Sequence, residues 1–337
     1  MLHIVEPTLI NRAGHCWGLA KMLAEARPDA EATLWVGKKA DASLAPAPRW
    51  HIRPYFIRRI RRLQYAALMA RLLSQGALVF TPTASRSELA AYAALPEAVR
   101  RRGRAVFYIH QTRLDARGRR KMRFIAPRLR HAMVLTTHAE LAQAWRENGA
   151  ANVLHVPYPI PLRARFSEAP FRRFVVPGIA REDKGFALLA EIVRRLAQVP
   201  SPPPFWIQAA PNHHGEYSPA IRNILAEMEA CAWNGCVIAR KALDEDAYHA
   251  QFSGGICLQP YDPEAYRAKI TSVALDALAA GCPIIASRGL WSAEIVHRFG
   301  CGAVLDARDA DAWVAAILEA PKHYEAWRKC AHQAAQT

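Results

Sequence analysis

The sequence lacks any run of about 18 apolar residues uninterrupted by charge, the length that a helix needs to cross a bilayer. It also lacks a CxxC pair, and its seven cysteines are an odd number, which argues against a disulfide framework and a zinc site. Internal repeats and low-complexity segments are missing too. From these absences we predict a cytoplasmic protein with reduced thiols, without a signal peptide, a membrane span or a metal site.

Acidic side chains are scarce in the first half of the chain only. Residues 1–160 carry 26 Lys and Arg but 10 Asp and Glu, whereas the remainder carries 19 of each. The whole net charge of +16 therefore arises in the first half. Such a one-sided distribution predicts an anionic partner, and a membrane surface, a phosphorylated acceptor or nucleic acid would each fit it.

The densest basic segment, residues 100–130, holds 12 Lys and Arg and a single acid, Asp115. Its aromatic residues are only Phe107, Tyr108 and Phe124, and the first two fall in an expected buried strand. No RNA- or DNA-binding motif accompanies the charge. We therefore expect no nucleic acid as a partner.

A second basic segment, PYFIRRIRRLQYAALMARLL at residues 54–73, has the periodicity of a helix. Its expected apolar face carries Phe56, Ile60, Leu63, Ala67 and Ala70, and its flanking arginines are Arg58, Arg59, Arg61 and Arg62. The pattern fits a helix lying on anionic lipid, and it fits equally a packed surface helix with solvated arginines. We favour a membrane or phosphate contact because the arginines stand so close to the apolar stripe, which would place the protein peripherally on the inner face of the cytoplasmic membrane.

Strand and helix patterns alternate along the whole chain, and its 337 residues suffice for two domains of roughly 150 residues. Pro157, Pro159 and Pro161 predict a stiff linker near the middle. We therefore expect an α/β protein of two doubly wound, Rossmann-like domains facing each other across a cleft. Residues 1–160 would form a basic, acceptor-binding domain, residues 161–320 a nucleotide-sugar-binding domain, and residues 321–337 a helix that crosses back to the first domain.

The stretch 254–287 predicts a buried strand, a polar loop, a helix from about Thr271 to Gly281, and another strand. Such a unit places a helix N-terminus beside the carboxyl ends of strands, where the amides of Thr271 and Ser272 could hold a phosphate. Asp276 lies on an otherwise apolar helix, where a carboxylate needs a partner. A ribose diol would serve, although a solvent-facing Asp276 on an ordinary amphipathic helix is the alternative.

The segment LDALAAGCPIIAS, residues 275–287, resembles the helix and strand that carry the second acid of the EX7E motif in retaining GT-B glycosyltransferases, especially glycosyltransferase family four. The resemblance implies that Asp276 binds the ribose of a sugar nucleotide. The place of the first acid, eight residues earlier, is taken by Ala268. Glu264 is the nearest substitute for its contact with the donor sugar.

Gly178, Lys184 and Gly185 are similar to the family's G-R-x-x-x-x-K-G turn, whose Arg and Lys grip the diphosphate. Ile179 occupies the usual Arg position, so Arg181 would have to supply that charge. A lysine beside a helix N-terminus is useful only if an anion binds there, because the helix dipole otherwise disfavours it.

His110 ends the expected strand 104–110, and the resemblance assigns it to positioning the donor sugar; a structural histidine is the alternative. Gly14 and His15 match only loosely the family's glycine-containing loop, which faces the donor phosphates or the acceptor. Gly14 fits equally a residue that eases the chain into the following helix.

The resemblance implies a metal-independent, retaining hexosyltransferase without a cofactor. It would move a sugar from a nucleoside diphosphate to a glycan or lipid-linked acceptor in cell-surface polysaccharide or glycolipid synthesis, with His110 and Lys184 as its catalytic residues. Two alternatives stay open: a GT-B epimerase or phosphorylase, and a non-catalytic basic protein of this fold that binds anionic membrane or nucleic acid.

Overall fold

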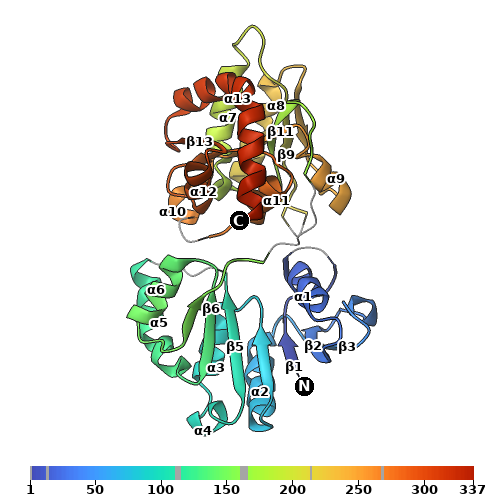
Figure 1. Cartoon of the computed structure of the whole chain (residues 1–337), viewed down its shortest axis with the longest axis vertical. Coiled ribbons are helices and arrows are strands. Elements are labelled where there is room, and N and C mark those ends of the chain that lie inside the picture. The colour runs from blue at the N-terminus through green and yellow to red at the C-terminus, as the bar shows by residue number, and fades with distance from the viewer. Residues whose placement is uncertain (1, 13–14, 111–114, 160–165, 213–214, 267–268) are drawn as a thin grey trace. The chain divides into compact units, whose positions relative to one another are not determined.

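A computed structural model of the chain describes residues 2–12, 15–110, 115–159, 166–212, 215–266 and 269–337 (Figure 1). The chain divides into two compact units, Met1–Pro161 and Leu162–Thr337, which we call unit 1 and unit 2. Each has its own parallel sheet and is described by itself; the cleft expected between them stays a prediction. Gly14 and Ala268, which the sequence singled out, lie outside the described residues.

Unit 1 is built on a seven-stranded sheet in which every neighbouring pair is parallel, in the order β3-β2-β1-β4-β5-β6-β7. Its strands are β1 (Leu2–Val5), β2 (Ala32–Gly37), β3 (Trp50–Phe56), β4 (Leu78–Thr81), β5 (Arg104–Ile109), β6 (Ala132–Thr136) and β7 (Val153–His155). Its helices are α1 (His15–Ala26), η1 (Ala42–Leu44), α2 (Arg61–Ser74), α3 (Arg86–Ala93), α4 (Glu97–Arg100), α5 (Ala116–Ile125), η2 (Ala126–Leu129) and α6 (Ala139–Glu147). The expected doubly wound architecture is confirmed for this unit.

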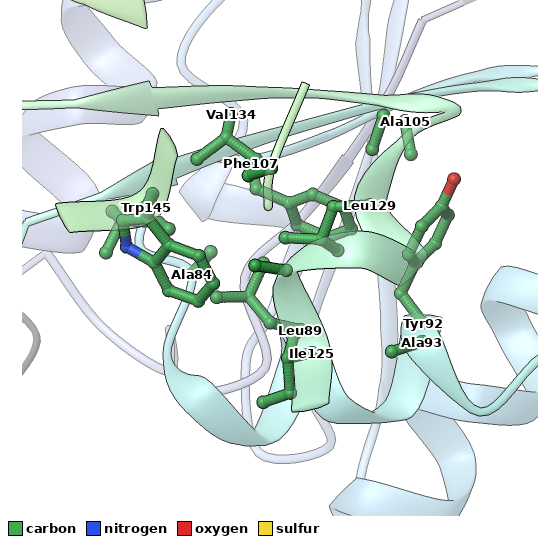
Figure 2. Packing of buried hydrophobic residues seen from close by; sticks show 14 of the residues in the cluster. Ala84, Leu89, Tyr92, Ala93, Ala105, Phe107, Ile125, Leu129, Val134 and Trp145 are labelled. Atoms are coloured by element: carbon green, nitrogen blue, oxygen red, sulfur yellow. The ribbon is translucent and has the colours of Figure 1, made fainter. Parts of the chain in front are cut away.

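The core of unit 1 forms where helices cover the central strands. Phe107 on β5 and Val134 on β6 pack against Leu89 of α3, Leu129 of η2 and Trp145 of α6 (Figure 2). All five side chains are at most 1 % exposed. Parallel strands are covered on both faces, which explains why the central strands read as apolar runs rather than as alternating patterns.

Unit 2 has a six-stranded parallel sheet in the order β10-β9-β8-β11-β12-β13. Its strands are β8 (Arg173–Val176), β9 (Phe205–Gln208), β10 (Cys236–Ala239), β11 (Gly255–Gln259), β12 (Ile284–Ser287) and β13 (Gly302–Leu305). Its helices are η3 (Glu182–Lys184), α7 (Phe186–Leu196), α8 (Pro219–Cys231), α9 (Glu245–Ala250), α10 (Pro263–Tyr266), α11 (Ser272–Ala279), α12 (Trp291–Phe299) and α13 (Ala310–Gln336). The strands β11 and β12 are buried along their whole length, as their apolar sequences predicted.

The predicted helix over residues 54–73 is wrong at its start. The chain first forms the edge strand β3, and α2 begins only at Arg61, so Arg58 and Arg59 lie in the turn between them. Pro54 is tolerated in β3 because one side of an edge strand makes no backbone hydrogen bonds to another strand. The face of α2 that is buried also differs from the predicted stripe; it consists of Tyr65, Leu68, Met69, Leu72 and Leu73.

The separate helix expected over residues 321–337 is the second half of one longer helix, α13, drawn in red in Figure 1. Pro321 lies inside it, although an interior proline typically costs about 3 kcal/mol. Buried Trp313 and Ile317 before the proline, and Tyr324 after it, continue one stripe that packs on unit 2, which explains why the helix does not end there. The predicted return of the last helix to the first domain stays a prediction. No helix in the described part of the chain is both long and apolar enough to cross a membrane.

Candidate functional site

The strand order of unit 2 reverses between β8 and β11, because β9 and β10 lie to one side of β8 and β12 and β13 lie beyond β11. Open α/β sheets bind ligands outside the carboxyl ends of the strands at such a switch point. The segment after β8 contains Gly178 and Lys184, and the segment after β11 contains Tyr261. The switch point therefore brings together residues from the two motifs that the sequence analysis identified.

Gly178 lets the Lys184 side chain lie against the backbone. Gly178 has a φ of 103°, and a Cβ atom added to it would lie 2.8 Å from Lys184 Nζ. The ammonium group is 3.5 Å from the Pro177 carbonyl oxygen and 5.8 Å from the centre of the Tyr261 ring. Among the described residues no carboxylate lies within ion-pair distance of it. Burial and the nearby Arg181 charge together lower the pKa of Lys184 to about 8, and the Asp183 charge offsets only part of this effect.

Gly185 fixes the start of α7 against the segment after β11. Its φ is 71°, and an added Cβ would lie only 1.7 Å from the Pro260 carbonyl oxygen. A side chain at this position would force the two segments apart, so only glycine permits the approach. The Gly178 amide donates to Gln208 Oε1 at 2.8 Å, which ties the end of β8 to β9. Backbone packing at Gly178 and Gly185 thus fixes the surroundings of the Lys184 side chain, which we call the Lys184 cradle.

Tyr261 connects Lys184 to the N-terminus of α11, a role that the sequence analysis missed. Its side chain is 1 % exposed, and its hydroxyl interacts with Thr271 without reaching the geometry of a hydrogen bond. Gln259 Oε1 is also buried with no hydrogen-bond partner in the described part of the chain. An unsatisfied buried polar group costs about 1–3 kcal/mol, so polar groups left open here favour a ligand or water as their partner. Their position, Gln259 at the end of β11 and Tyr261 just after it, is the signal that could have identified both.

The structure describes no side chain that caps or neutralises the N-terminus of α11 within its first turn. Thr271 is the N-cap residue, but its side chain accepts no capping hydrogen bond, and the first turn contains no acid. Ser272 is the first helical residue and is exposed. Free amides and the partial positive charge of the helix suit an anion here.

Asp276 has a partner that the sequence did not reveal. The Tyr248 hydroxyl of α9 donates to Asp276 Oδ2 at 3.0 Å. Burial, with the neighbouring Asp276 charge, raises the pKa of Tyr248 well above its usual value, so the phenol stays protonated and keeps donating. Asp276 is therefore held in one orientation on its apolar helix, and it is not the fully solvent-facing carboxylate of the alternative interpretation.

Arg181 and Glu264 are less engaged with this site. Arg181 donates to Asp183 through both Nε and a terminal nitrogen, the first at 2.8 Å, and to the Tyr266 hydroxyl at 3.3 Å. Its charge is thus largely balanced by Asp183, whereas Lys184 has no carboxylate within ion-pair distance among the described residues. Glu264 is exposed in the first turn of α10.

In unit 1, His110 follows β5 and is held by its surroundings. Its Nε2 atom lies 2.7 Å from the Pro82 carbonyl oxygen, which can only accept, so Nε2 carries the proton. Its ring lies edge-on to the rings of Tyr108 and Tyr158, with centroids 4.7 and 5.1 Å away. These contacts suit a structural histidine and a positioning residue alike. Gly14 is outside the described residues, and His15 is described only as the first residue of α1.

Glu6 is a buried acid that the sequence analysis did not consider. It follows β1, and Thr83, which donates a hydrogen bond to its Oε1 atom, follows β4. The strand order of unit 1 reverses between these two strands, so this pair lies at the switch point of unit 1. An acid placed directly after the first apolar strand, in HIVEP, is the signal that could have identified it.

No three His, Cys, Asp or Glu side chains within the described ranges gather closely enough to hold a metal ion. The metal independence expected from the sequence stays a prediction.

No protein-family model and no curated protein matches the sequence. Similar solved structures include sucrose-phosphate synthase from Thermosynechococcus elongatus, with 15% identity, a TM-score of 0.70, and coverage of 99% of this chain and 94% of that one. HepE from Anabaena, solved in complex with UDP, has 12% identity, a TM-score of 0.72, and coverage of 99% and 93%. WaaG, a glycosyltransferase involved in lipopolysaccharide biosynthesis, has 14% identity, a TM-score of 0.65, and coverage of 100% and 95%. At these identities the likeness establishes the fold, and it confirms the GT-B fold expected from the sequence.

Proposed function

We propose that the protein is a retaining glycosyltransferase that moves a sugar from a nucleoside diphosphate to a hydroxyl group of a glycan or a lipid-linked acceptor. The observation that carries the proposal is the ammonium group of Lys184. It lies against Gly178 at the switch point of unit 2, and no carboxylate of the described residues is within ion-pair distance of it. HepE, a protein of the same fold, has been solved with UDP and with UDP-glucose, which supports a nucleotide sugar as the donor.

The cations and amides of unit 2 would act on the leaving diphosphate. Negative charge develops there as the bond to the sugar breaks, and donors already in place stabilise it most effectively. Lys184 and the amides of Thr271 and Ser272 fit this role. With a pKa of about 8, Lys184 is mostly charged at pH 7, and a bound phosphate would raise that pKa and keep the charge.

The remaining positions orient the donor. Asp276, held by Tyr248, would accept hydrogen bonds from the ribose diol. Arg181, whose charge Asp183 balances only in part, would also bind the diphosphate. Glu264 would take the place of the first acid of the EX7E motif and contact the donor sugar. The role of His110, orienting the donor sugar, rests on the resemblance alone. No metal or cofactor takes part in this proposal, and the leaving phosphate would take the acceptor proton.

A membrane-bound acceptor is supported by one surface of unit 1. Ile57, Ile60 and Leu63 are 46%, 46% and 75% exposed, and they alternate in sequence with Arg58, Arg59, Arg61 and Arg62. Exposed apolar side chains among arginines suit the interface of an anionic leaflet, which would place the protein on the inner face of the cytoplasmic membrane. Changing the four arginines to Glu should release the protein from anionic vesicles, and unchanged binding would refute this contact.

A panel of nucleotide sugars tests the central proposal without an acceptor, because retaining transferases hydrolyse their donors slowly in its absence. The first step is to follow thermal unfolding with UDP and GDP, since a ligand that binds the folded state raises the midpoint. The second is to measure hydrolysis of the sugar conjugates of whichever nucleotide binds. If no nucleotide or conjugate shifts the midpoint and RNA does, the protein is a nucleic-acid-binding protein and the transferase proposal fails.

A further inference from the structure

We propose that unit 1 contains a second anion site, separate from the switch point of unit 2, that binds a phosphate group carried on an organic molecule. A hollow of about 850 Å³ lies between α2, α3 and α5. Its cations are Arg62, Arg86, Arg117, Arg120 and Lys121, and we call it the basic hollow. None of these five has an ion-pair partner among the residues that the structure describes.

The cations of α5 are placed where they repel one another. Arg117, Arg120 and Lys121 stand three and four residues apart, which puts them on one face of the helix. Like charges at this spacing destabilise a helix. Arg117 also lies in the first turn, where the helix dipole disfavours a positive charge. An anion in the hollow would relieve both effects at once.

The side of the basic hollow opposite α5 is formed by the N-terminus of α3. It also has a cation in the first turn of a helix, where the dipole disfavours positive charge. Arg86 is the first residue of α3. The one acid of that wall, Glu88, is buried and accepts hydrogen bonds from the Ser85 amide and from the hydroxyls of Ser85 and Ser87. Glu88 therefore completes the helix cap and leaves Arg86 without an ion pair.

The acid nearest to α5 is used in the same way. Asp115 is the N-cap of α5 and accepts a hydrogen bond from the Gly118 amide at 2.6 Å. It also lines a smaller adjoining hollow of about 220 Å³ with Arg86, Arg117 and Lys121. Neither acid lines the basic hollow itself, whose charged lining residues in the described part of the chain are the five cations. Helix dipoles and side chains thus both favour additional negative charge here.

The shape and apolar lining of the basic hollow define the class of ligand. Its volume is well beyond that of a single phosphate, and it includes Ala90, Ile125 and Phe124, whose ring is 64% exposed and lies 4.1 Å from the Arg128 guanidinium carbon. A phosphate on an organic body would place its charge among the cations and its carbon atoms against these side chains. The group could belong to a soluble phosphate ester or to a lipid headgroup. All residues of this site belong to unit 1, so the inference does not depend on transferase activity.

Calorimetric titration of the full-length protein with inorganic pyrophosphate at low ionic strength tests the site. The matched variants are Arg120→Glu/Lys121→Glu and Arg101→Glu/Arg102→Glu, which change the net charge equally on the same unit, the second pair being exposed residues outside the lining. Since each lost hydrogen bond to a charged group is worth about 1.5–3 kcal/mol, we expect the first variant to lose at least about tenfold in affinity. The second should lose less than about twofold, because distant surface charges are screened.

Equal losses in the two variants, or no pyrophosphate binding by the Lys184→Met protein with both pairs intact, would overturn the proposal. Lys184→Met serves as the background for all titrations, so that pyrophosphate bound at the switch point of unit 2 does not contribute. If Arg120→Glu/Lys121→Glu does not fold, as judged by circular dichroism, Arg120→Gln/Lys121→Gln replaces it, with an expected loss of about threefold or more. A loss below twofold in that folded variant would also overturn the site.

Vesicles distinguish the two sources of the phosphate. Phosphatidylcholine vesicles containing phosphatidic acid carry a phosphomonoester headgroup, and vesicles with an equal fraction of phosphatidylglycerol carry a diester. If the source is a lipid, the unaltered protein should bind the first more tightly, and Arg120→Glu/Lys121→Glu should remove that preference. If pyrophosphate binding depends on the pair and the vesicle preference is absent, a soluble phosphate ester occupies the basic hollow.

Discussion

In unit 2 a single ammonium group, that of Lys184, is half-buried against Gly178 and the Tyr261 ring, whereas in unit 1 five cations stand around the basic hollow, most of them exposed. Burial makes one charge costly, so its pKa falls and its geometry is fixed by glycine backbone. Each exposed cation attracts an anion only weakly, because water and salt screen its charge. The basic hollow therefore favours anions only because five cations act together. One unit thus suits a defined diphosphate, and the other suits a range of phosphate-bearing groups.

We expect the largest effect from removing the Lys184 charge of unit 2. Lys184→Met should reduce kcat/KM for donor hydrolysis by about 10²–10³, the effect typical of losing one preorganised donor to a developing negative charge. The matched control is Arg194→Met, which removes an exposed charge of the same unit that is paired with Glu191. We expect it to change kcat/KM by less than about twofold. A loss below about fivefold for Lys184→Met would contradict the role of Lys184.

The pH dependence of stability tests the desolvation of Lys184, because burial lowers the pKa of this lysine. The pKa of Lys184 is about 8 in the folded state against 10.5 for an ordinary lysine. Between these values the unfolded state binds more protons, so the free energy of unfolding should rise with pH, by about 3 kcal/mol in total. Chemical denaturation from pH 7 to pH 10.5 measures this.

Lys184→Met is the reference for that measurement, because other lysines titrate in the same range. The difference between the unaltered protein and the variant should grow with pH above 8. Bound phosphate should abolish the growth, because an anion restores the usual pKa of the lysine. A constant difference across the range would show that the lysine is not desolvated.

A Gly178→Ala variant tests whether anion binding by unit 2 depends on the Lys184 cradle and not on the lysine charge alone. Gly178→Ala keeps Lys184 but places a methyl group 2.8 Å from the present position of its Nζ atom. The end of a lysine side chain moves at little cost, so we expect nucleotide affinity to fall about tenfold while stability changes little beyond the backbone strain. Gly300→Ala is the control, because Gly300 also has a positive φ, 65°, but nothing lies within 4 Å of an added Cβ.

Both alanine variants should lose about 1–2 kcal/mol of stability from the left-handed backbone conformation. Only Gly178→Ala should weaken nucleotide binding, as measured by calorimetry. Equal affinities in the two variants would mean that the position of the ammonium group is unimportant.

The sequence predicted those parts of the site that are made by contiguous residues. The turn GIAREDKG includes all the residues that position its lysine, because Gly178, Lys184 and Gly185 lie within eight residues of one another. The buried strands β11 and β12 were likewise evident from their apolar sequences. Edge strand β3 was missed because the arginine-rich periodicity after Pro54 reads as a helix, and no local signal separates the two interpretations there.

Partnerships across elements could not be predicted in the same way. Tyr248 and Asp276 are 28 residues apart and meet only because α9 and α11 pack in one cluster. The basic hollow needs three helices, one of which, α5, had been recognised only as a run of charge. Composition revealed the excess of cations, but which of them converge depends on the sheet order and the helix packing.

The smallest expected effect separates the nucleoside part of the ligand from its phosphates. Tyr248→Phe removes the hydrogen bond to Asp276 while keeping the ring that packs on Phe252 at 5.5 Å between centroids. A hydrogen bond to a charged group is worth about 1.5–3 kcal/mol, but solvent or ribose can replace part of it. We therefore expect nucleotide affinity to fall only about three- to tenfold, with pyrophosphate affinity unchanged.

Tyr324→Phe is the matched control, because its hydroxyl donates to the Ala169 carbonyl oxygen at 3.1 Å elsewhere in unit 2. It should lower stability to a similar extent and leave both affinities unchanged. If Tyr248→Phe weakens pyrophosphate as much as nucleotide, Asp276 acts on the phosphate site through the orientation of α11 rather than on the ribose. The position of Asp276 one turn from Thr271 makes that the competing explanation, and the ratio of the two affinities decides between them.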